Sequence, residues 1–153
     1  MLYRLPGVLV HWDDVARDRF EWEPETAAWW RDLGRAAGAR GVGVRRMEVD
    51  PGKQSEAAHM DTAEEEIFVV LDGSGTVLLG DDEHPLRRGH VVARPPGTRI
   101  SHTFRADEEP LTLLVYGTRE PSDITYYPRS RTFWVRGIGV IGRAEGLSRE
   151  DVW

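Results

Sequence analysis

The chain of 153 residues contains no cysteine. This absence excludes disulfide bonds, thiolate metal sites and cysteine nucleophiles, and it leaves histidine, aspartate and glutamate as the strong ligand types. Any metal would therefore be bound through nitrogen and oxygen atoms.

Lysine and long apolar runs are also scarce. Lys53 is the single lysine among 20 cationic side chains, and the net charge of −6 offers no broad basic surface to nucleic acid. The longest apolar run, Ile67–Leu71, is far shorter than the roughly 20 residues of a membrane-spanning helix. The first residues lack the pattern of a signal peptide. We expect a cytoplasmic protein that binds neither nucleic acid nor membrane.

What is present is the composition of an ordinary packed protein, with 40% hydrophobic and 30% charged residues. The length suits one domain. We predict a single domain over residues 1–153, with an N-terminal helical and strand extension over 1–40, central motifs over 41–117, and further strands and a tail over 118–153.

The N-terminal extension predicts one short helix. Pro24 suits a first helical turn, and Glu25–Ala37 contains good helix formers. Trp29, Trp30 and Leu33 would form an apolar face on this helix that packs on the core or on a partner. We assign these three residues no chemistry.

From Gly41 onward, short runs rich in β-branched residues alternate with turn residues, which is typical of an antiparallel all-β sandwich or barrel. Between the runs, Asp72–Gly75, Gly80–Glu83 and Arg94–Gly97 have turn chemistry. We expect consecutive strands to be hairpin neighbours. One or two more strands should follow Gly117, and Ser148–Trp153 should form a tail that packs on a partner. The predicted strands are Val42–Val49, Glu65–Leu71, Thr76–Leu79, His90–Ala93, Ser101–Arg105 and Leu111–Tyr116.

Two stretches carry side chains that bind metals. In an extended segment His59 and Asp61 point to the same side, and Glu66 opens the most apolar strand, where a buried carboxylate needs a cation or donors. Glu65 is the alternative to Glu66, because strand alternation allows only one of them to point inward. In the second stretch a Pro-Gly turn precedes His102, and pairing into a barrel would return His102 beside His59.

These stretches resemble the two sequence motifs of the cupin superfamily. Glu66 is followed by six residues and Gly73, and Gly89 by five residues and Pro95, which are the spacings of both motifs. The resemblance covers about Gly41–Gly117. Within the family, the chain is similar to small single-domain bacterial cupins of uncharacterised function. It implies an antiparallel double-stranded β-helix, also called a jelly-roll barrel.

The resemblance also implies one divalent metal ion in the barrel mouth. Its ligands would be His59, Glu66 and His102, with Asp61 at a position where the family usually has a second histidine. Two carboxylates and two imidazoles favour Mn²⁺ or Fe²⁺ and leave Zn²⁺, Ni²⁺ and Co²⁺ open. Asp61 could instead hydrogen-bond Thr62 or bind through water.

Other residues are expected around this site. Phe68, Val70 and Phe104 share the side-chain parity of Glu66 and His102 and should line an apolar interior. The polar rim would come from Arg45, Met47 and Tyr116. The remaining histidines, His11, His84 and His90, are expected at the surface.

Three functions follow as hypotheses. The first is an enzyme of the dioxygenase, isomerase or decarboxylase type, acting on a small organic molecule at the metal. The second is a non-catalytic module that binds or senses a metabolite at the same site. The third is a barrel without metal, in which the acidic cluster around Glu64 is only a solvated edge. No Ser-His-Asp or phosphate-loop pattern assigns a catalytic residue. We also predict a homodimer, with the Trp-rich N-terminal segment and the Phe133-Trp134 strand at its interface.

Overall fold

The computed structural model describes residues 8–145, and nearly all of its regular structure is β-strand. The predicted tail Ser148–Trp153 lies outside the described residues. None of the helices in residues 8–145 is long and apolar enough to cross a membrane. The strands are β1 (Asp18–Phe20), β2 (Ala28–Asp32), β3 (Val42–Val49), β4 (Met60–Asp61), β5 (Glu66–Asp72), β6 (Ser74–Leu79), β7 (Asp82–Arg87), β8 (Val91–Arg94), β9 (His102–Ala106), β10 (Leu111–Thr118), β11 (Ile124–Tyr127), β12 (Thr132–Val135) and β13 (Val140–Arg143). The helices are α1 (Leu33–Ala36), η1 (Trp12–Asp14) and η2 (Arg136–Ile138).

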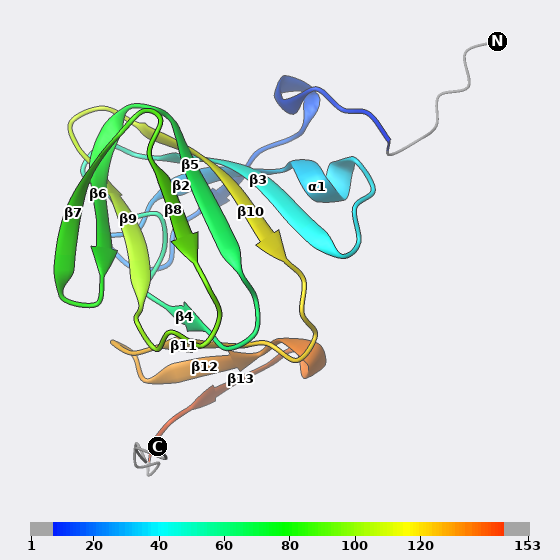
Figure 1. Ribbon diagram of the computed structural model, residues 1–153, viewed down its shortest axis with the longest axis vertical. Coiled ribbons are helices and arrows are strands. Elements are labelled where there is room, and N and C mark those ends of the chain that lie inside the picture. Colours follow the sequence, from blue (N-terminus) through cyan, green and yellow to red (C-terminus); the bar gives the residue numbers. More distant parts are fainter. Residues whose placement is uncertain (1–7, 146–153) are drawn as a thin grey trace.

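The described strands form three antiparallel sheets. Six strands lie in the order β1-β2-β3-β10-β5-β8, three in the order β7-β6-β9, and four in the order β13-β12-β11-β4. Figure 1 shows the three-stranded sheet beside the β5, β8 and β10 part of the large sheet, with the C-terminal sheet across one end. The all-β antiparallel barrel predicted from the sequence is confirmed.

The core lies between the six-stranded and the three-stranded sheets. Phe68 and Val70 of β5 and Phe104 of β9 are almost fully buried, as their parity predicts, and Phe68 and Phe104 are in ring contact. Met47, predicted at the polar rim, is instead part of this core, and Tyr116 points outward with 40% of its surface exposed. Those two predictions were wrong, because strand alternation points Met47 of β3 into the core and Tyr116 of β10 to the outside.

The predicted helix over Glu25–Ala37 was also wrong in extent. Helix α1 covers only Leu33–Ala36, whereas Ala28–Asp32 is the strand β2 and pairs with β3, with Trp29 opposite Glu48. Helix propensity is a weak preference, and here pairing with a neighbouring strand outweighs it.

Not all consecutive strands are hairpin neighbours. Strands β5 and β6 belong to different sheets although only Gly73 separates them, so the segment predicted as a hairpin turn is a corner. Gly73 has φ +80°, and a Cβ there would lie 2.2 Å from the Pro110 carbonyl oxygen. Only glycine allows the chain to pass from one sheet to the other so close to this backbone.

Candidate metal centre and adjoining cavity

Two histidines far apart in the sequence lie side by side. His59 immediately precedes β4, and His102 is the first residue of β9. Their backbones form an antiparallel bridge in which each N–H donates to the other carbonyl, over 3.2 Å from His59 and 2.8 Å from His102. The ring centroids are 4.5 Å apart. The expectation that His102 returns beside His59 is confirmed.

Glu66 joins the two imidazoles. Its Oε2 lies 3.1 Å from His102 Nε2, and one ligand atom each from His59, Glu66 and His102 all lie within 4.8 Å of one another. Glu65 is exposed, and its N–H donates to Thr118 Oγ1. Strand alternation therefore turns Glu66 toward the histidine pair and Glu65 to the outside.

Buried polar atoms in this cluster lack hydrogen-bond partners among the described residues. They are Glu66 Oε2 and both ring nitrogens of His102, because the 3.1 Å contact between Glu66 Oε2 and His102 Nε2 does not have the geometry of a hydrogen bond. His59 Nδ1 contacts the Ala57 carbonyl over 3.0 Å, so its Nε2 is left for the cluster. Unsatisfied buried polar atoms are costly, and a cation bound by the three side chains would remove most of that cost. The residues present therefore fit a divalent metal ion, and they could hold one.

Asp61 is adjacent to this group but is not part of it. Its Oδ2 lies 3.8 Å from His59 Nε2, whereas its Oδ1 accepts a hydrogen bond from Thr125 Oγ1 over 2.9 Å. The Arg136 guanidinium is 3.9 Å from the same Oδ1. The side chain predicted as the fourth ligand is thus held by neighbours on β11 and η2.

Burial and neighbouring charges put His102 and Glu66 in the forms that bind metals. Burial, together with His59, lowers the pKa of His102 to about 4. Burial alone would raise the pKa of Glu66, but contact with His102 outweighs burial and lowers it. A neutral imidazole and an ionised carboxylate thus face each other. Burial raises the pKa of Asp61 to about 7, and for His59 the carboxylates of Glu56, Asp61 and Glu66 outweigh burial and raise the pKa.

Asp123 supports the segment between His59 and Glu66. This fully buried carboxylate accepts hydrogen bonds from the backbone N–H groups of Thr62, Ala63 and Glu64, at 3.0, 2.8 and 3.2 Å. Its other oxygen lies 3.4 Å from Arg136 Nε. Asp123 was not identified from the sequence, because nothing near it in the chain signals that role.

Glu56 is a second residue that the sequence reasoning missed. Its Oε1 lies 3.9 Å from His59 Nε2, and burial raises its pKa. No hydrogen bond joins this carboxylate to another described side chain. Glu56 stands in the first motif stretch three residues before His59, and that spacing was the only available signal.

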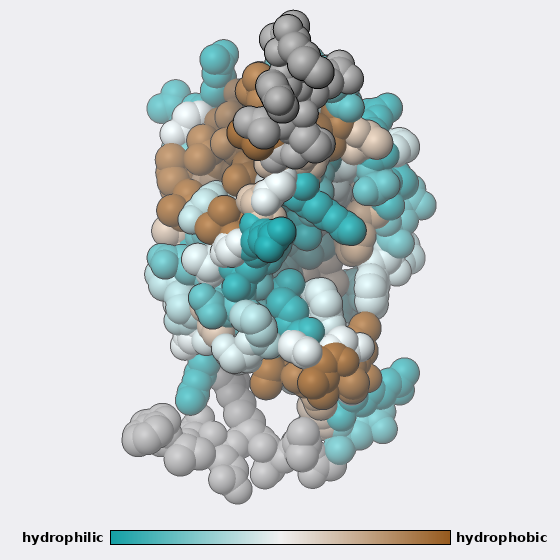
Figure 2. All heavy atoms as spheres, turned by 90° about the vertical axis from the view of Figure 1, so that its right-hand side faces the viewer, coloured by the Kyte–Doolittle hydropathy of each residue, from teal (hydrophilic) through white to brown (hydrophobic). Residues whose placement is uncertain are grey.

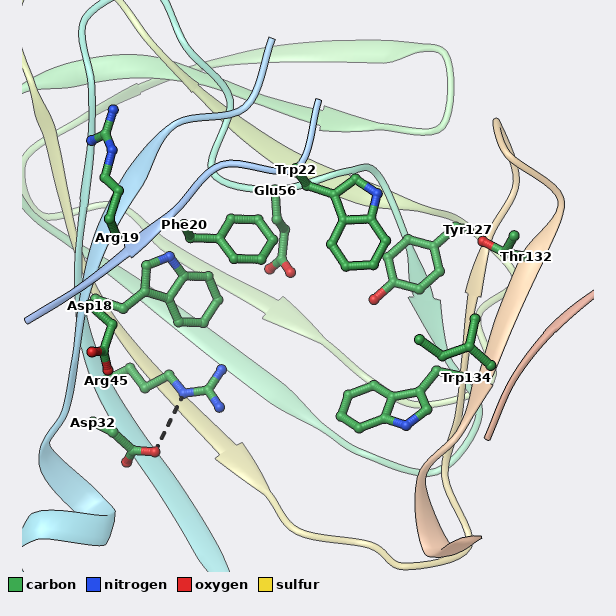
Figure 3. A pocket seen from close by; sticks show the side chains of 12 residues that line it. Asp18, Arg19, Phe20, Trp22, Asp32, Arg45, Glu56, Tyr127, Thr132 and Trp134 are labelled. Atoms are coloured by element: carbon green, nitrogen blue, oxygen red, sulfur yellow. Dashed lines mark ion pairs between the residues drawn. The ribbon is translucent and has the colours of Figure 1, made fainter. Parts of the chain in front are cut away.

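A cavity of about 460 Å³ lies next to the cluster of His59, Glu66 and His102. None of these three side chains lines it, but two lining residues, Glu56 and Tyr127, are neighbours of His59. The Tyr127 ring centroid is 5.8 Å from that of His59. Figure 3 shows aromatic side chains on opposite sides of this cavity, with the Arg45 guanidinium and the Glu56 carboxylate between them. The predicted role of Arg45 at a polar rim agrees with this position. The lining residues are Asp18, Arg19, Phe20, Trp22, Trp30, Asp32, Arg45, Glu56, Tyr127, Thr132, Trp134 and Ile141.

The walls of this cavity come from the two ends of the described chain. Phe20 and Trp22 belong to the N-terminal extension, and Trp30 lies on β2. Tyr127 and Trp134 lie on β11 and β12. Trp30, predicted to pack on the core or on a partner, packs against the core and also lines the cavity. Trp134, predicted at a dimer interface, lines the cavity as well.

The other histidines lie outside the cluster. His84 is exposed on β7, and His90 Nδ1 accepts a hydrogen bond from the Arg87 N–H. His11 Nδ1 accepts one from the Asp13 N–H. Their predicted surface positions are confirmed.

The family model of the cupin domain matches residues 45–117, which contain the three clustered side chains and both predicted motifs. Residues 45–117 form a domain of the cupin superfamily. The match begins after β2 and ends before β11, so the aromatic residues of both cavity walls lie outside it, whereas Arg45 and Glu56 lie within it.

Two solved structures match this cupin over nearly its whole length. A candidate sugar phosphate isomerase from Acidithiobacillus ferrooxidans has a TM-score of 0.82 and 26% identity, over 94% of this chain and 97% of its own. A sugar phosphate isomerase of the cupin superfamily from Silicibacter pomeroyi has a TM-score of 0.80 and 24% identity, with the same coverage. A polyketide cyclase from Streptomyces resistomycificus has a TM-score of 0.62 and 25% identity, over 78% of this chain and 81% of its own. The first two therefore share the extensions as well as the barrel.

Among curated proteins, the chain matches the apicoplast elongation factor Tu of Theileria parva at 32% identity over 76 residues. The match spans half of this chain and only 18% of that protein. The sequence has no Gly-x₄-Gly-Lys-Ser/Thr phosphate loop, so this likeness supports no nucleotide-binding role.

Proposed function

We propose that this cupin is an isomerase that acts on a small hydroxylated carbonyl compound, with His59, Glu66 and His102 holding a divalent metal ion. The observation that carries the proposal is the group of orphaned ligand atoms next to a partly open cavity of about 460 Å³. Glu56 and Tyr127, which line the cavity, are neighbours of His59. The full-length likeness to a candidate sugar phosphate isomerase supports this reaction class and makes aldose phosphates the first compounds to test.

The metal ion, when bound, would polarise a carbonyl or hydroxyl oxygen of the substrate. Glu56 lies in the cavity beside His59 and has no hydrogen-bond partner among the described side chains, so its carboxylate is free to meet a substrate. In an aldose–ketose exchange one proton moves from C2 to C1 and one from O2 to O1, with no net oxidation. Glu56 takes the C2 proton and returns it to C1, and no further reactant is needed.

This role of Glu56 is tested by a Glu56→Gln variant, which keeps the shape of the side chain and removes the base. We expect unchanged metal content by elemental analysis and about 10²- to 10⁴-fold slower exchange of substrate C–H for deuterium in D₂O, followed by proton NMR. Glu83→Gln, on the exposed strand β7, is the matched control and should leave exchange unchanged. Tight binding of a compound with no exchange or product would support a binding module in place of an enzyme. A protein that binds no divalent metal after reloading would disprove the proposal.

We also propose that the chain forms a homodimer through the outer face of strands β10, β5 and β8. Apolar side chains lie there in two rows across the sheet, and β8 is its edge strand, which can pair with a second chain. Val91 and Tyr116 have 62% and 40% of their surface exposed. Figure 2 shows apolar atoms gathered at the upper left of the surface, on the side that faces the reader in Figure 1. The rows are Leu114, Val69 and Val91, and Tyr116, Ile67 and Ala93.

A further inference from the structure

We propose that Arg45 binds an anionic group, a carboxylate or a phosphate, on the molecule that occupies the cavity. This inference rests on the proposed function, because it assigns the substrate class of the same site. The ligand would be a small ring compound with one oxyanion at Arg45 and its reacting oxygen atoms toward Glu56 and the metal cluster.

Arg45 presents unused donors to the cavity. Its Nε lies 4.0 Å from Asp32 Oδ2, and no hydrogen bond joins the guanidinium to another described residue. Figure 3 shows its two terminal nitrogens pointing away from Asp32 into the space between the aromatic walls. The guanidinium carbon lies 4.8 Å from the centre of the Trp30 ring, which braces the cation from one side. A fixed guanidinium with free donors is the usual receptor for a planar or tetrahedral oxyanion.

The charges around Arg45 leave it without a full protein counter-ion. Asp32 already caps helix α1, since its Oδ1 accepts a hydrogen bond from the Arg35 N–H over 3.0 Å. Glu56 lies across the cavity, and no ion pair within 4.0 Å joins it to Arg45. Burial, and then the nearby Arg119 cation, lower the pKa of Arg45, and the carboxylates of Asp32, Glu56 and Glu66 offset this only in part. An anionic ligand would supply the missing charge.

Arg19, the second arginine of the cavity, differs in this respect. Its Nε donates to Glu21 over 2.8 Å and its Nη2 to Asp50 over 2.7 Å. Both sides of that guanidinium are therefore occupied by carboxylates of the protein. Of the two cavity arginines, only Arg45 has its donors free for a ligand.

The walls favour a ring compound over a bare anion. Phe20 contacts both Trp22 and Trp30, with ring centroids 6.3 and 5.7 Å apart, and Trp22 stacks on Tyr127 at 6.3 Å. Trp134 faces them from β12, with the Arg136 guanidinium 4.5 Å from its ring centre. Such surfaces bind the flat or C–H-rich face of a ring and exclude water, which strengthens the contact between Arg45 and an anion.

The test uses two series of probes in which the same kind of ring carries a phosphate, a carboxylate or a neutral hydroxyl group: glucose 6-phosphate, glucuronate and glucose, and phenyl phosphate, benzoate and benzyl alcohol. Binding to the metal-loaded protein is measured by isothermal titration calorimetry. We expect anionic probes of at least one series to bind about 10- to 100-fold more tightly than the neutral one, and Arg45→Gln to remove that difference. Whether the phosphate or the carboxylate binds more tightly identifies the anion.

Arg46→Gln is the matched control, because Arg46 is the next residue of β3, faces the other side of the sheet and pairs with Glu48 at 2.8 Å. It should keep the preference for anions. The inference is overturned if no series shows such a preference, or if Arg45→Gln keeps it while remaining folded and metal-loaded. Metal content and isomerase activity are measured separately, so a wild-type protein that binds metal and isomerises a substrate but shows no preference for anionic probes contradicts only this inference. A protein without metal that still binds anions at Arg45 contradicts only the proposed function.

Discussion

At the scale of single residues, the candidate metal-binding cluster consists of three side chains that the two motifs identify. His59, Glu66 and His102 were predictable because strand parity and motif spacing fix their direction. Asp61 shares the parity of His59, but its carboxylate is held by Thr125 and Arg136, which lie more than 60 residues further along the chain. No local pattern could have revealed those partners.

The difference between Asp61 and the three clustered side chains predicts unequal effects of alanine substitutions on metal binding. We expect His59→Ala, Glu66→Ala and His102→Ala each to abolish stoichiometric binding. Asp61→Ala should weaken binding by about 10- to 100-fold, as for a residue that orients a ligand. Titration with Mn²⁺ and Fe²⁺ under anaerobic conditions, with elemental analysis of the products, measures both. Complete loss of metal in Asp61→Ala would instead make Asp61 a direct ligand, as the sequence predicted.

At the scale of elements, six of the strands were predicted within two residues at each end, because each carries alternating or continuous apolar residues. Strand β7 was missed because Asp82–Pro85 reads as a turn and its side chains are exposed. Strand β2 was missed because its residues are also acceptable in a helix. In both cases the pairing partner decides the conformation, and a local pattern does not contain that partner.

The segment between β4 and β5 depends on Asp123, which lies just before β11 and about 60 residues further along the chain. Asp123 holds the backbone of Thr62, Ala63 and Glu64, and this segment places Glu66. Burial would raise the pKa of Asp123, but these hydrogen bonds and the Arg136 charge outweigh burial and lower it. A carboxylate with a lowered folded-state pKa stabilises the protein above its unfolded-state pKa, and this contribution is lost as the pH falls below about 4.

We therefore expect Asp123→Ala to lower the free energy of unfolding by about 3 kcal/mol at pH 7, since it removes a buried, hydrogen-bonded charge and leaves the backbone N–H groups of Ala63 and Glu64 without their acceptor. The difference from the wild type should shrink as the pH is lowered below about 4. Urea denaturation at several pH values measures it. Asp81→Ala, in the exposed turn between β6 and β7, should change the free energy of unfolding by less than about 0.5 kcal/mol. A pH-independent difference would contradict the assigned role of the charge.

At the scale of the whole molecule, the barrel carries the three side chains of the candidate metal-binding cluster. The aromatic cavity walls come from the two ends of the described chain. The motif resemblance covered the barrel and could not reach the walls, which are built by Phe20, Trp22, Tyr127 and Trp134 from outside it. Their aromatic character was visible in the sequence, but their common destination depends on the topology of three sheets.

The proposed dimer is a prediction at this scale. In sedimentation velocity at micromolar concentration we expect a dimer for the wild type and a monomer for Val91→Asp, because the substitution puts a charge on the edge strand β8, at the end of an apolar row of the proposed interface. Ile138→Asp, at a residue of η2 with 72% of its surface exposed, should remain a dimer. A monomeric wild type would rule out this interface.

The stacking of Trp22 on Tyr127 joins an early and a late part of the chain, so it can form only after both parts have been synthesised. All three clustered side chains precede β11 in the chain, so a ribosome has produced them before it produces Tyr127, Thr132 or Trp134. Joining residues so distant in sequence carries a high cost in chain entropy, which the barrel strands must offset first. During synthesis the metal-binding side chains are therefore complete at a time when the cavity still lacks one of its walls.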